Sequence, residues 1–381
     1  MKQPISQTPQ SQQASKIPDE WEKIELGRKI ILEYGKGLTE KSRKEGEYKV
    51  YGSNGVIGLH NDFLIEGPGI VIGRKGSIGE VVWSENNFWP IDTTYFVKLT
   101  NDLVDLRFLY YKLISLKLQK MNSATGTPGL NREVVYAKET YFPKLKEEQT
   151  AIAKILSTTD EALEALERER LATERLRRGF MVKLLENQKW KVVKLGEIVE
   201  FVKGKKPEKM INEQLEGYLP YLSTDYLRDN EETKYVSTSE NIFLVKDGEI
   251  VLLWDGSNAG EFFEGKEGIL STTMVKFNLK TDIHQKYLLY LLKSKQNYLQ
   301  GQTNGTGIPH VDRKVLMDLD ITLPPLEEQK RIAEVLSIID KKLELQKARK
   351  EKIERVKKGL MDELLTGKKR VNVEKVLEEE K

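Results

Sequence analysis

The sequence predicts an α+β fold in which two α/β heads with β-rich cores are separated by two long antiparallel coiled-coil helices, arranged as a pseudo-twofold internal repeat. The first observation behind this prediction is a duplication with an offset near 180 residues. Its clearest copies are PKLKEEQTAIAKILSTTDEALE from Pro143 and PPLEEQKRIAEVLSIIDKKLE from Pro324, which align without a gap from Gln149 onward. The second is that both copies continue as long proline-free runs with helical spacing. A repeat of this length predicts architecture before any local motif is considered.

The repeat divides the chain into six segments. A polar opening rich in Gln and Ser, residues 1–17, is expected to be disordered. The predicted segments that follow are a first head over 18–146, a first long helix over 147–187, a second head over 188–327, a second long helix over 328–367 and a C-terminal tail over 368–381.

The heads repeat each other more loosely than the helices do. Trp21 matches Trp190 at an offset of 169, and IVIGRKGSIG from Ile70 resembles IVLLWDGSNAG from Ile250. Short runs rich in β-formers are separated by Gly, Asn and Asp turns, which is typical of strands in a curved or partly closed sheet. The two heads are therefore expected to share a fold while differing in surface residues.

Apolar residues at alternating spacings of four and three form a heptad-like stripe on each long helix. The residues predicted to pair the helices are Ile152, Leu156, Leu163, Leu166 and Phe180 in the first copy and Ile332, Leu336, Ile339, Leu343, Ile353 and Leu360 in the second. The first helix ends where the second head begins, so the second helix can retrace the first only by running antiparallel to it. The apolar ends of the helices, such as Phe180, Met181, Leu360 and Met361, are expected either to contact partners or to pack in a core.

Composition excludes several classes of function. The 381 residues contain no cysteine, which excludes disulfides, thiol nucleophiles and cysteine-based zinc sites. Three scattered histidines lack ligand spacing, so no metal site is expected. The chain also lacks an apolar run long enough for a membrane helix and an apolar signal-peptide core, and a cytoplasmic protein is expected. With 62 Lys and Arg against 59 Asp and Glu, any nucleic-acid contact must use locally concentrated charge.

The sequence motifs that would indicate nucleotide binding or catalysis are incomplete or missing. GEFFEGKE from Gly260 fits the first seven positions of a phosphate-binding loop but has Glu267 where Ser or Thr is required. The sequence has neither an NPPY-like adenine-methylation loop nor an S-adenosylmethionine glycine motif. We therefore expect the chain to be non-catalytic, with no catalytic residue, no metal site and no cofactor of its own.

Binding remains as the expected activity. In the first head, cations suited to phosphates alternate with polar side chains that can read base edges, and a glycine-rich segment adds further cations. The candidate DNA-binding residues there are Arg43, Lys44, Lys49, Tyr51, Ser53, Asn54, His60, Arg74, Lys75, Ser77, Asn131 and Arg132. In the second head they are Lys203, Lys205, Lys206, Ser223, Thr224, Tyr226, Trp254, Ser257, Asn258, His310 and Arg313. Each residue taken singly is also compatible with a surface or turn position.

The pattern resembles the specificity (S) subunit of type I restriction-modification enzymes. LPPLEEQKRIAEVLSIIDKKLE from Leu323 is similar to that family's junction between a target-recognition domain and a helix, and FPKLKEEQTAIAKILSTTDEALE from Phe142 supplies the junction again. GSNG from Gly52 and GRKGSIG from Gly73 are similar to recurring segments of its recognition domains. The first junction departs by Lys144 in place of the second proline and by one extra residue, which affects loop spacing.

The resemblance implies a function for the whole chain. Each head would be a target-recognition domain that reads one half of a bipartite, asymmetric double-stranded DNA sequence, and the helices would set the spacer. Two methyltransferase (M) subunits carrying S-adenosylmethionine, for adenine N6 methylation, would dock on the pseudo-equivalent surfaces. Restriction or translocase (R) subunits, using ATP and Mg²⁺, would join for restriction.

Three other functions stay open at this level. They are a stand-alone DNA-binding or scaffold protein without methyltransferase partners, an enzyme with a nuclease or methyltransferase site in one head, and a structural coiled coil with sugar- or protein-binding heads. Co-purification with a methyltransferase, Mg²⁺-dependent cleavage by the chain alone, and sequence-specific DNA retention distinguish these functions.

Overall fold

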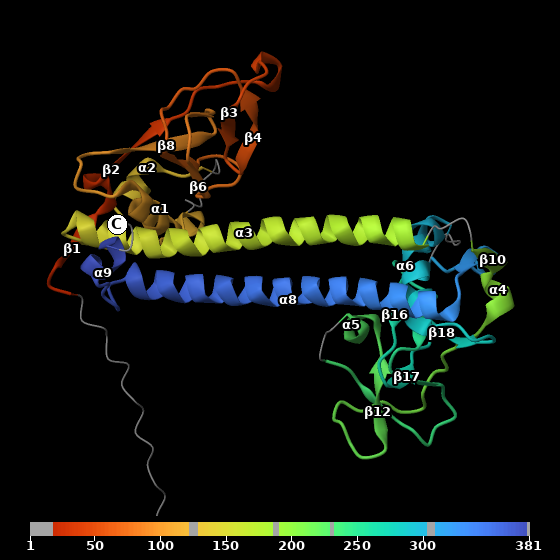
Figure 1. Cartoon of the computed structure of the whole chain (residues 1–381). Helices are drawn as coiled ribbons and strands as arrows, with labels where there is room; N and C mark the ends of the chain where they lie inside the picture. The colour runs from red at the N-terminus through yellow and green to blue at the C-terminus, as the bar shows by residue number, and fades with distance from the viewer. Residues whose placement is uncertain (1–17, 122–128, 186–189, 229–231, 303–308, 379–381) are drawn as a thin grey trace, which may run out of the picture. The chain divides into compact units, whose positions relative to one another are not determined.

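The structure is a computed structural model that describes residues 18–121, 129–185, 190–228, 232–302 and 309–378. The predicted disordered opening over 1–17 lies outside these residues, as do the last three residues of the tail. The chain forms two compact units, one of residues 1–167 with 348–381 and the other of residues 168–347. Each unit contains one head and one half of each long helix (Figure 1).

The head of the first unit is built on sheets whose strands are mostly antiparallel. Its main sheet has the order β2 (Ile30–Tyr34), β8 (Thr94–Leu99), β5 (Gly69–Gly73) and β6 (Val81–Ser84). A second sheet has the order β4 (Gly55–His60), β3 (Tyr48–Gly52) and β7 (Phe88–Pro90), and β1 (Trp21–Glu25) pairs with β9 (Glu139–Pro143). The helices are α1 (Leu106–Ser115) and α2 (Arg132–Tyr136), and three short 3-10 turns span Leu26–Arg28, Glu40–Ser42 and Leu118–Met121.

The head of the second unit repeats this main sheet with diverged residues. The order β11 (Val199–Lys203), β18 (Met274–Leu279), β15 (Ile250–Leu253) and β16 (Phe262–Glu264) corresponds strand by strand to the first head. A second sheet joins β13 (Tyr235–Ser237), β12 (Tyr218–Leu222), β17 (Gly268–Leu270) and β14 (Leu244–Val245), and β10 (Lys191–Lys194) pairs with β19 (Asp320–Leu323). The helices are α4 (Leu195–Ile198), α5 (Thr224–Leu227), α6 (Gln285–Gly301) and α7 (Arg313–Met317).

Burial follows the strand patterns. In β2, Ile30 and Leu32 are buried while Ile31 between them is exposed, as alternation requires of a strand with one solvated face. β5 is an inner strand of its sheet and is buried along its whole length. α1 and α6 cover the sheets, and their first turns are capped by Asp105, which accepts from the Phe108 amide at 2.7 Å, and by His284.

The two long helices are α3 (Lys146–Leu185) and α8 (Leu326–Leu364), and a short α9 (Val373–Glu378) follows in the tail. The helices α3 and α8 pair antiparallel within each unit. As the residue number rises along α3, the number of the partner residue on α8 falls. In the first unit Asp160 pairs with Lys357, and Glu167 pairs with Lys350 at 3.1 Å. In the second unit Arg177 pairs with Asp340 and Glu169 with Lys342.

The predicted pairing stripe needs correction at its ends. Ile152 and Leu156 belong to the core of the first head, and Ile332 and Leu336 to the core of the second, because the heads cover the first turns of the helices. Phe180 is 37% exposed and is not a buried pairing residue. Leu166 is buried, and the remaining stripe residues, Leu163, Ile339, Leu343, Ile353 and Leu360, are half-buried.

The far ends of the helices complete the heads. Leu364 and Leu365 lie in the core of the first head, and Leu185 lies in that of the second. Met361 and Met181 pack against the same two cores. Met181, Leu360 and Met361 at the helix ends therefore pack against the cores, the second of the two roles that the sequence allowed, whereas Phe180 is exposed.

Candidate DNA interface

Four loops of the first head are brought together by backbone hydrogen bonds. The amides of Arg74 and Lys75, after β5, donate to the Thr93 carbonyl at 2.9 and 3.1 Å. The Leu130 amide, before α2, donates to the Arg74 carbonyl at 2.9 Å, and the Gly35 amide, after β2, donates to Thr94 at 3.2 Å. We call residues 34–37, 74–77, 91–93 and 129–132 the loop face of the first head.

The second head has an equivalent loop face. The amides of Trp254 and Asp255 donate to the Thr273 carbonyl at 2.8 and 3.2 Å, and the Val311 amide donates to the Trp254 carbonyl at 3.0 Å. The Gly204 amide donates to Met274 at 3.0 Å. Residues 203–206, 254–258, 271–273 and 309–313 form this second loop face, and one backbone frame therefore occurs in both heads.

Glycine permits the close approach of these loops. A Cβ on Gly35 would lie 2.2 Å from the Ile91 carbonyl oxygen, and a Cβ on Gly204 would lie 2.0 Å from that of Ser271. No side chain tolerates such contacts with backbone atoms, so both positions require glycine. The glycines therefore fix the loops in place and leave the residues around them to supply the surface chemistry.

On the first loop face, two arginines stack on one exposed tyrosine. Tyr34 is 50% exposed, and the guanidinium groups of Arg74 and Arg132 lie 5.0 and 4.6 Å from its ring centre. Arg74 donates through Nε and Nη2 to the Asp92 carbonyl at 3.2 and 2.8 Å, and Arg132 donates through Nη1 to Leu32 at 3.3 Å. This arrangement concentrates positive charge on a stacked aromatic platform.

A buried tyrosine packs against the exposed ring of Tyr34. Tyr95 packs against Tyr34 with ring centres 5.2 Å apart, and its hydroxyl donates to the Leu130 carbonyl at 3.0 Å. Burial is the largest cause that raises the pKa of Tyr95, to about 12, so its hydroxyl stays protonated at neutral pH and keeps donating. Lys36 lies beside this cluster over the Trp89 ring, at 5.9 Å.

The second loop face carries a comparable cluster with different residues. The Arg313 guanidinium lies 5.0 Å from the Phe201 ring centre, and Phe201 lies 5.0 Å from the half-buried Trp254. Lys203 Nζ pairs with Asp255 Oδ2 at 2.6 Å. Aromatic rings and cations thus meet in both heads, but only the second cluster includes a carboxylate among its paired groups.

Most predicted residues of the first head lie on or beside its loop face. Arg74, Lys75, Ser77, Asn131 and Arg132 belong to it, although the Asn131 side chain also caps α2 by accepting from the Glu133 amide at 2.9 Å. A Cβ on Gly76 would lie 3.2 Å from Ser53 Oγ, so the β3–β4 turn with Ser53 and the exposed Asn54 adjoins this face.

Two predictions in the first head are wrong. Tyr51 is 2% exposed and packs edge-on against Phe88, because β3 is the central strand of its sheet. His60 is also buried, accepts from the Lys44 amide through Nδ1 at 3.0 Å and packs on Trp89. Neither side chain is free to reach DNA. Arg43 braces the hairpin by donating to the Ile57 carbonyl, whereas the side chains of Lys44 and Lys49 are exposed beside it.

In the second head the predicted residues divide into two groups. Lys203, Lys205, Lys206, Trp254, Ser257, Asn258, His310 and Arg313 lie on the loop face. Ser223, Thr224 and Tyr226 lie instead at the start of α5, where Ser223 Oγ accepts from the Tyr226 amide and Lys266 lies over the Tyr226 ring. These contacts support local structure, and the short helix has no direct hydrogen bond to the loop face through these three residues.

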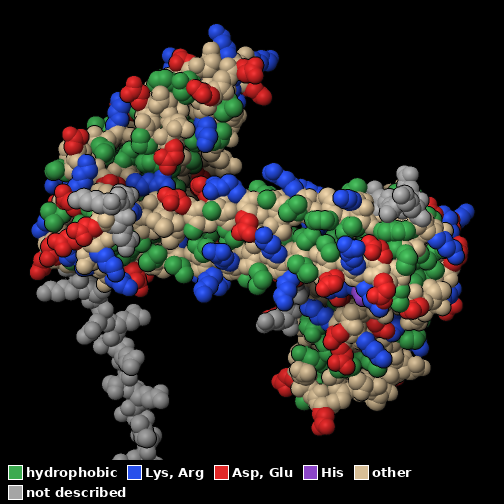
Figure 2. Space-filling view, in the orientation of Figure 1, with side chains coloured by type: hydrophobic (Ala, Val, Ile, Leu, Met, Phe, Trp, Pro, Cys, Tyr) green, Lys and Arg blue, Asp and Glu red, His purple; other side chains and the backbone are tan. Residues whose placement is uncertain are grey.

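Sequence reasoning missed Tyr34, Lys36 and Phe201. The signal was present, because extending the Trp21–Trp190 alignment at its offset of 169 aligns YGKG from Tyr34 with KGKK from Lys203. Figure 2 shows why charge alone does not mark the site, since Lys and Arg alternate with Asp and Glu over the visible surface of both heads.

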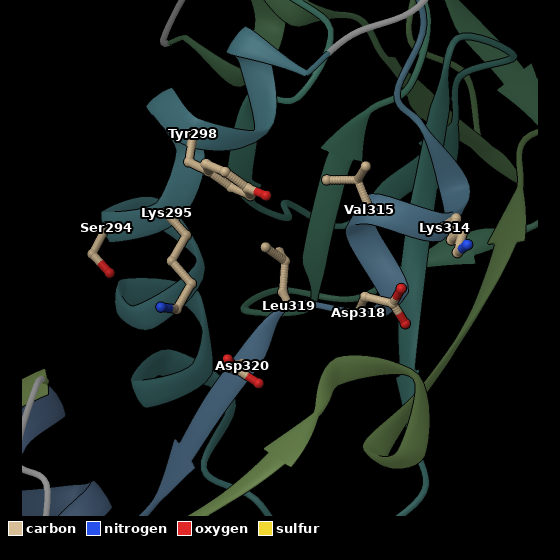
Figure 3. Close-up of a pocket in the computed structure, with 8 residues that line it drawn as sticks. All are labelled: Ser294, Lys295, Tyr298, Lys314, Val315, Asp318, Leu319 and Asp320. Carbon is tan, nitrogen blue, oxygen red and sulfur yellow. The ribbon is translucent and has the colours of Figure 1, made fainter.

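A separate pocket of about 470 Å³ lies in the second head between α6, α7 and the start of β19 (Figure 3). Tyr298 and Val315 face each other across it, and Lys295, Lys314 and Asp318 supply polar groups. Asp320 pairs with Lys194 at 2.6 Å, and the Ser294 hydroxyl donates to the Leu291 carbonyl. These last two groups are occupied by structural contacts, and the loop face remains the better candidate for binding.

Within the described part of the chain, none of the helices combines the length and the apolar character needed to cross a membrane. This holds for the long helices too, because both carry charged residues throughout.

Comparisons with known proteins agree on one family. The protein-family model described as "Type I restriction modification DNA specificity domain" matches residues 18–173 and again 187–355. The type I restriction enzyme MjaVIII specificity subunit of Methanocaldococcus jannaschii is 51% identical over 178 residues, which are 46% of this chain and 42% of that protein. The putative MjaX specificity subunit of the same organism is 30% identical over 302 residues, 69% of this chain and 68% of that protein.

A solved structure supports the fold. The S subunit of a type I restriction-modification system from M. genitalium matches with a TM-score of 0.71 at 21% identity, covering 94% of this chain and 99% of that one. The alignment with the MjaVIII subunit spans less than half of that relative, whereas the family model covers both heads and most of both long helices. The chain therefore belongs to the type I restriction modification DNA specificity family and carries two copies of its domain.

Proposed function

We propose that this chain is the specificity subunit of a type I restriction-modification complex, in which each head reads one half of a bipartite, asymmetric DNA target. The observation that carries the proposal is the pair of loop faces, which have the same backbone frame but different side chains. A common frame lets both heads approach DNA in the same way, and different side chains let them select different bases.

The helix pair has two roles in this proposal. It sets the spacer between the half-sites, and it offers two pseudo-equivalent surfaces for two methyltransferase subunits. Those subunits carry S-adenosylmethionine and methylate adenine N6, one on each strand, while restriction subunits bring ATP and Mg²⁺. The chain itself catalyses no step. The complex acts on DNA in the cytoplasm and does not bind a membrane.

A binding selection tests the proposal. The chain is purified together with its methyltransferase partner and incubated with random double-stranded DNA, and the retained fragments are sequenced. We expect two short motifs separated by a gap of constant length. Enrichment of one uninterrupted motif, or no enrichment by a stable complex, contradicts the proposal. Binding should weaken steeply as salt rises, because phosphate contacts release counterions.

Two controls separate the proposal from other functions. The chain alone, incubated with DNA, Mg²⁺ and S-adenosylmethionine, should neither cleave nor methylate the DNA. Affinity purification from cells that express the methyltransferase should recover both proteins in one complex, and recovery of the chain alone would favour a stand-alone DNA-binding protein.

A further inference from the structure

Three positions of the loop face can be compared directly between the heads. The first position is the last residue of β2 in the first head, Tyr34, and the last residue of β11 in the second head, Lys203. Tyr34 pairs with Tyr95 and Lys203 pairs with Val275 on the neighbouring strand. The second follows β5 or β15 and holds Arg74 or Trp254. The third begins α2 or α7 and holds Arg132 or Arg313.

The backbone shows that the second and third positions are equivalent. Arg74 and Trp254 each donate to a threonine carbonyl, at 2.9 and 2.8 Å, and each accepts from the loop that precedes the short helix, at 2.9 and 3.0 Å. Arg132 and Arg313 each follow a helix cap, Asn131 or Asp312, whose side chain accepts from the first turn. Differences in side chain at these positions are thus not caused by a different frame.

We propose, on the basis of the proposed function, that Arg132 and Arg313 hold DNA phosphates in both heads, whereas Arg74 with Lys75 and Trp254 with Asp255 select the bases of the two half-sites. The assignment sorts one binding surface into residues that position DNA and residues that read it.

The third position has the same chemistry in both heads. Arg132 lies over Tyr34 at 4.6 Å and Arg313 over Phe201 at 5.0 Å from the ring centre, so each places a guanidinium over an aromatic ring. A group that is identical in two heads cannot account for two different half-sites. It suits the part of DNA that is the same everywhere, and a guanidinium matches the geometry of a phosphate.

The second position and the residue after it differ in chemistry between the two heads. Arg74 is anchored on the Asp92 carbonyl through Nε and Nη2, and its Nη1 makes no hydrogen bond to any residue that the structure describes. Lys75 beside it is exposed. These groups only donate, and the major-groove edge of guanine offers two acceptors, so the first half-site should contain a guanine at the position that Arg74 reads.

The residue after the second position differs in charge between the heads, because Asp255 of the second head stands where the first head has Lys75. Asp255 is held by Lys203 at 2.6 Å, and its side chain is 31% exposed. A carboxylate repels phosphate but accepts from the exocyclic amino group of cytosine or adenine. Trp254 adds an apolar surface next to it. The second half-site should therefore contain an amino-bearing base at the position that Asp255 reads.

The test uses the complete complex with its methyltransferase and maps the modified motif by sequencing. Arg74→Ala should relax one guanine position of the first half-site only, and Asp255→Asn should relax or change one position of the second half-site only, with about tenfold to a hundredfold loss of discrimination. Arg132→Ala and Arg313→Ala should lower affinity for all sequences, leave the motif unchanged and reduce the salt slope by about one.

Lys41→Ala is the matched control, because Lys41 is an exposed cation of the first head outside the loop face. All variants are first compared with wild type for thermal unfolding, and Arg74→Lys provides a second, milder change at the reading position. An unchanged motif in folded Arg74 and Asp255 variants, or an altered motif in the Arg132 or Arg313 variants, overturns the inference. A wild-type complex without a gapped motif would instead contradict the proposed function itself.

Discussion

Glu148 is a buried carboxylate at the start of α3 in the first unit, with 2% of its surface exposed. It accepts from Arg370 through Nε at 2.6 Å and Nη2 at 3.0 Å, and from Trp21 Nε1 at 3.3 Å. Arg370 also reaches Glu20 at 2.7 Å, and its own pKa is raised chiefly by the hydrogen bond to Glu148. One tail residue thus joins the first strand of the head to the start of α3.

Replacing Arg370 with alanine should destabilise the first unit. The change leaves Glu148 buried without its cation, which costs about 2 kcal/mol once the partial exposure of Arg370 is considered. Lys369→Ala is the control, since Lys369 is exposed and its carboxylate partner is 3.9 Å away. Denaturant unfolding of both variants measures the difference, and equal unfolding midpoints would show that the Arg370–Glu148 ion pair contributes nothing to stability.

Lys112 on α1 is a buried amine in the same unit. Its Nζ donates to the Leu365 carbonyl at 2.7 Å, next to a cavity of about 860 Å³ that Leu163 and Met361 also line. Burial lowers the pKa of Lys112 to about 7. The folded protein therefore holds a neutral amine above that pH, whereas the unfolded chain keeps a protonated lysine until its ordinary pKa of 10.5.

This difference predicts a pH dependence of stability. Between about pH 7 and 10.5 the unfolded chain binds more protons, so Lys112 should add up to about 1.4 kcal/mol of stability for each rise of one pH unit. Below pH 7 both states are protonated and the slope from this residue disappears. Unfolding curves of wild type and Lys112→Met at pH 6, 7, 8 and 9 measure the effect. Parallel stability profiles of the two proteins would contradict it.

At the scale of elements, the two halves of the helix pair differ at one layer. In the second unit Gln346 donates to Thr173 Oγ1 at 3.3 Å, both residues are buried, and Gln346 Oε1 has no hydrogen bond to any of the described residues. The residues 180 positions away in the repeat are Leu166 and Ile353, which occupy this layer in the first unit. A polar pair thus stands where the other repeat has an apolar pair, which favours pairing of α3 with α8 over pairing of two identical helices.

Exchanging leucine and glutamine should affect stability differently at these two layers. Gln346→Leu removes a partly unsatisfied buried amide and should raise stability by about 1 kcal/mol or leave it unchanged. Leu166→Gln puts an unpaired amide into an apolar layer and should lower stability by about 2 to 3 kcal/mol. Denaturant unfolding of the two single variants compares them, and an equal loss in both would refute the distinction between the layers.

The long helices could be predicted from the sequence because a long proline-free periodic run has few alternatives. The predicted bounds 147–187 and 328–367 compare with the observed Lys146–Leu185 and Leu326–Leu364. Which surface covers Ile152 or Leu336 could not be predicted, since helical spacing is the same whether a head or another helix lies opposite. The compact units also divide the helices midway, after Glu167 and Lys347, because each half packs with a different head.

The site was predicted less completely than the helices. The loop residues Arg74, Arg132, Trp254 and Arg313 were found because glycine-rich turns marked them in both repeats. Tyr51 was assigned wrongly because alternation along β3 from the exposed Lys49 and the buried Val50 indicates an exposed Tyr51, whereas Val50 and Tyr51 are both buried at a register irregularity between them. The contacts of Tyr34 join residues far apart in the chain, and such pairings depend on the folded sheet.

At the scale of the whole molecule, we predict that helix length sets the DNA spacer. Deleting residues 164–170 together with 344–350 removes one heptad from each helix, which is about 10 Å of rise or about three base pairs of DNA. Both half-sites should stay the same while the gap between them shortens. The modified motif of the co-expressed complex measures this, and deletion of seven residues from the C-terminal tail is the control. An unchanged gap in a folded, active deletion variant would contradict the prediction.

The central claim is that one chain directs modification to two different half-sites separated by a fixed gap. The most direct measurement is to co-express the chain with its methyltransferase in cells that lack other adenine methylation and to sequence the modified genome. We expect a single gapped, asymmetric motif with one N6-methyladenine on each strand. A contiguous motif, or two motifs modified independently of each other, would contradict it.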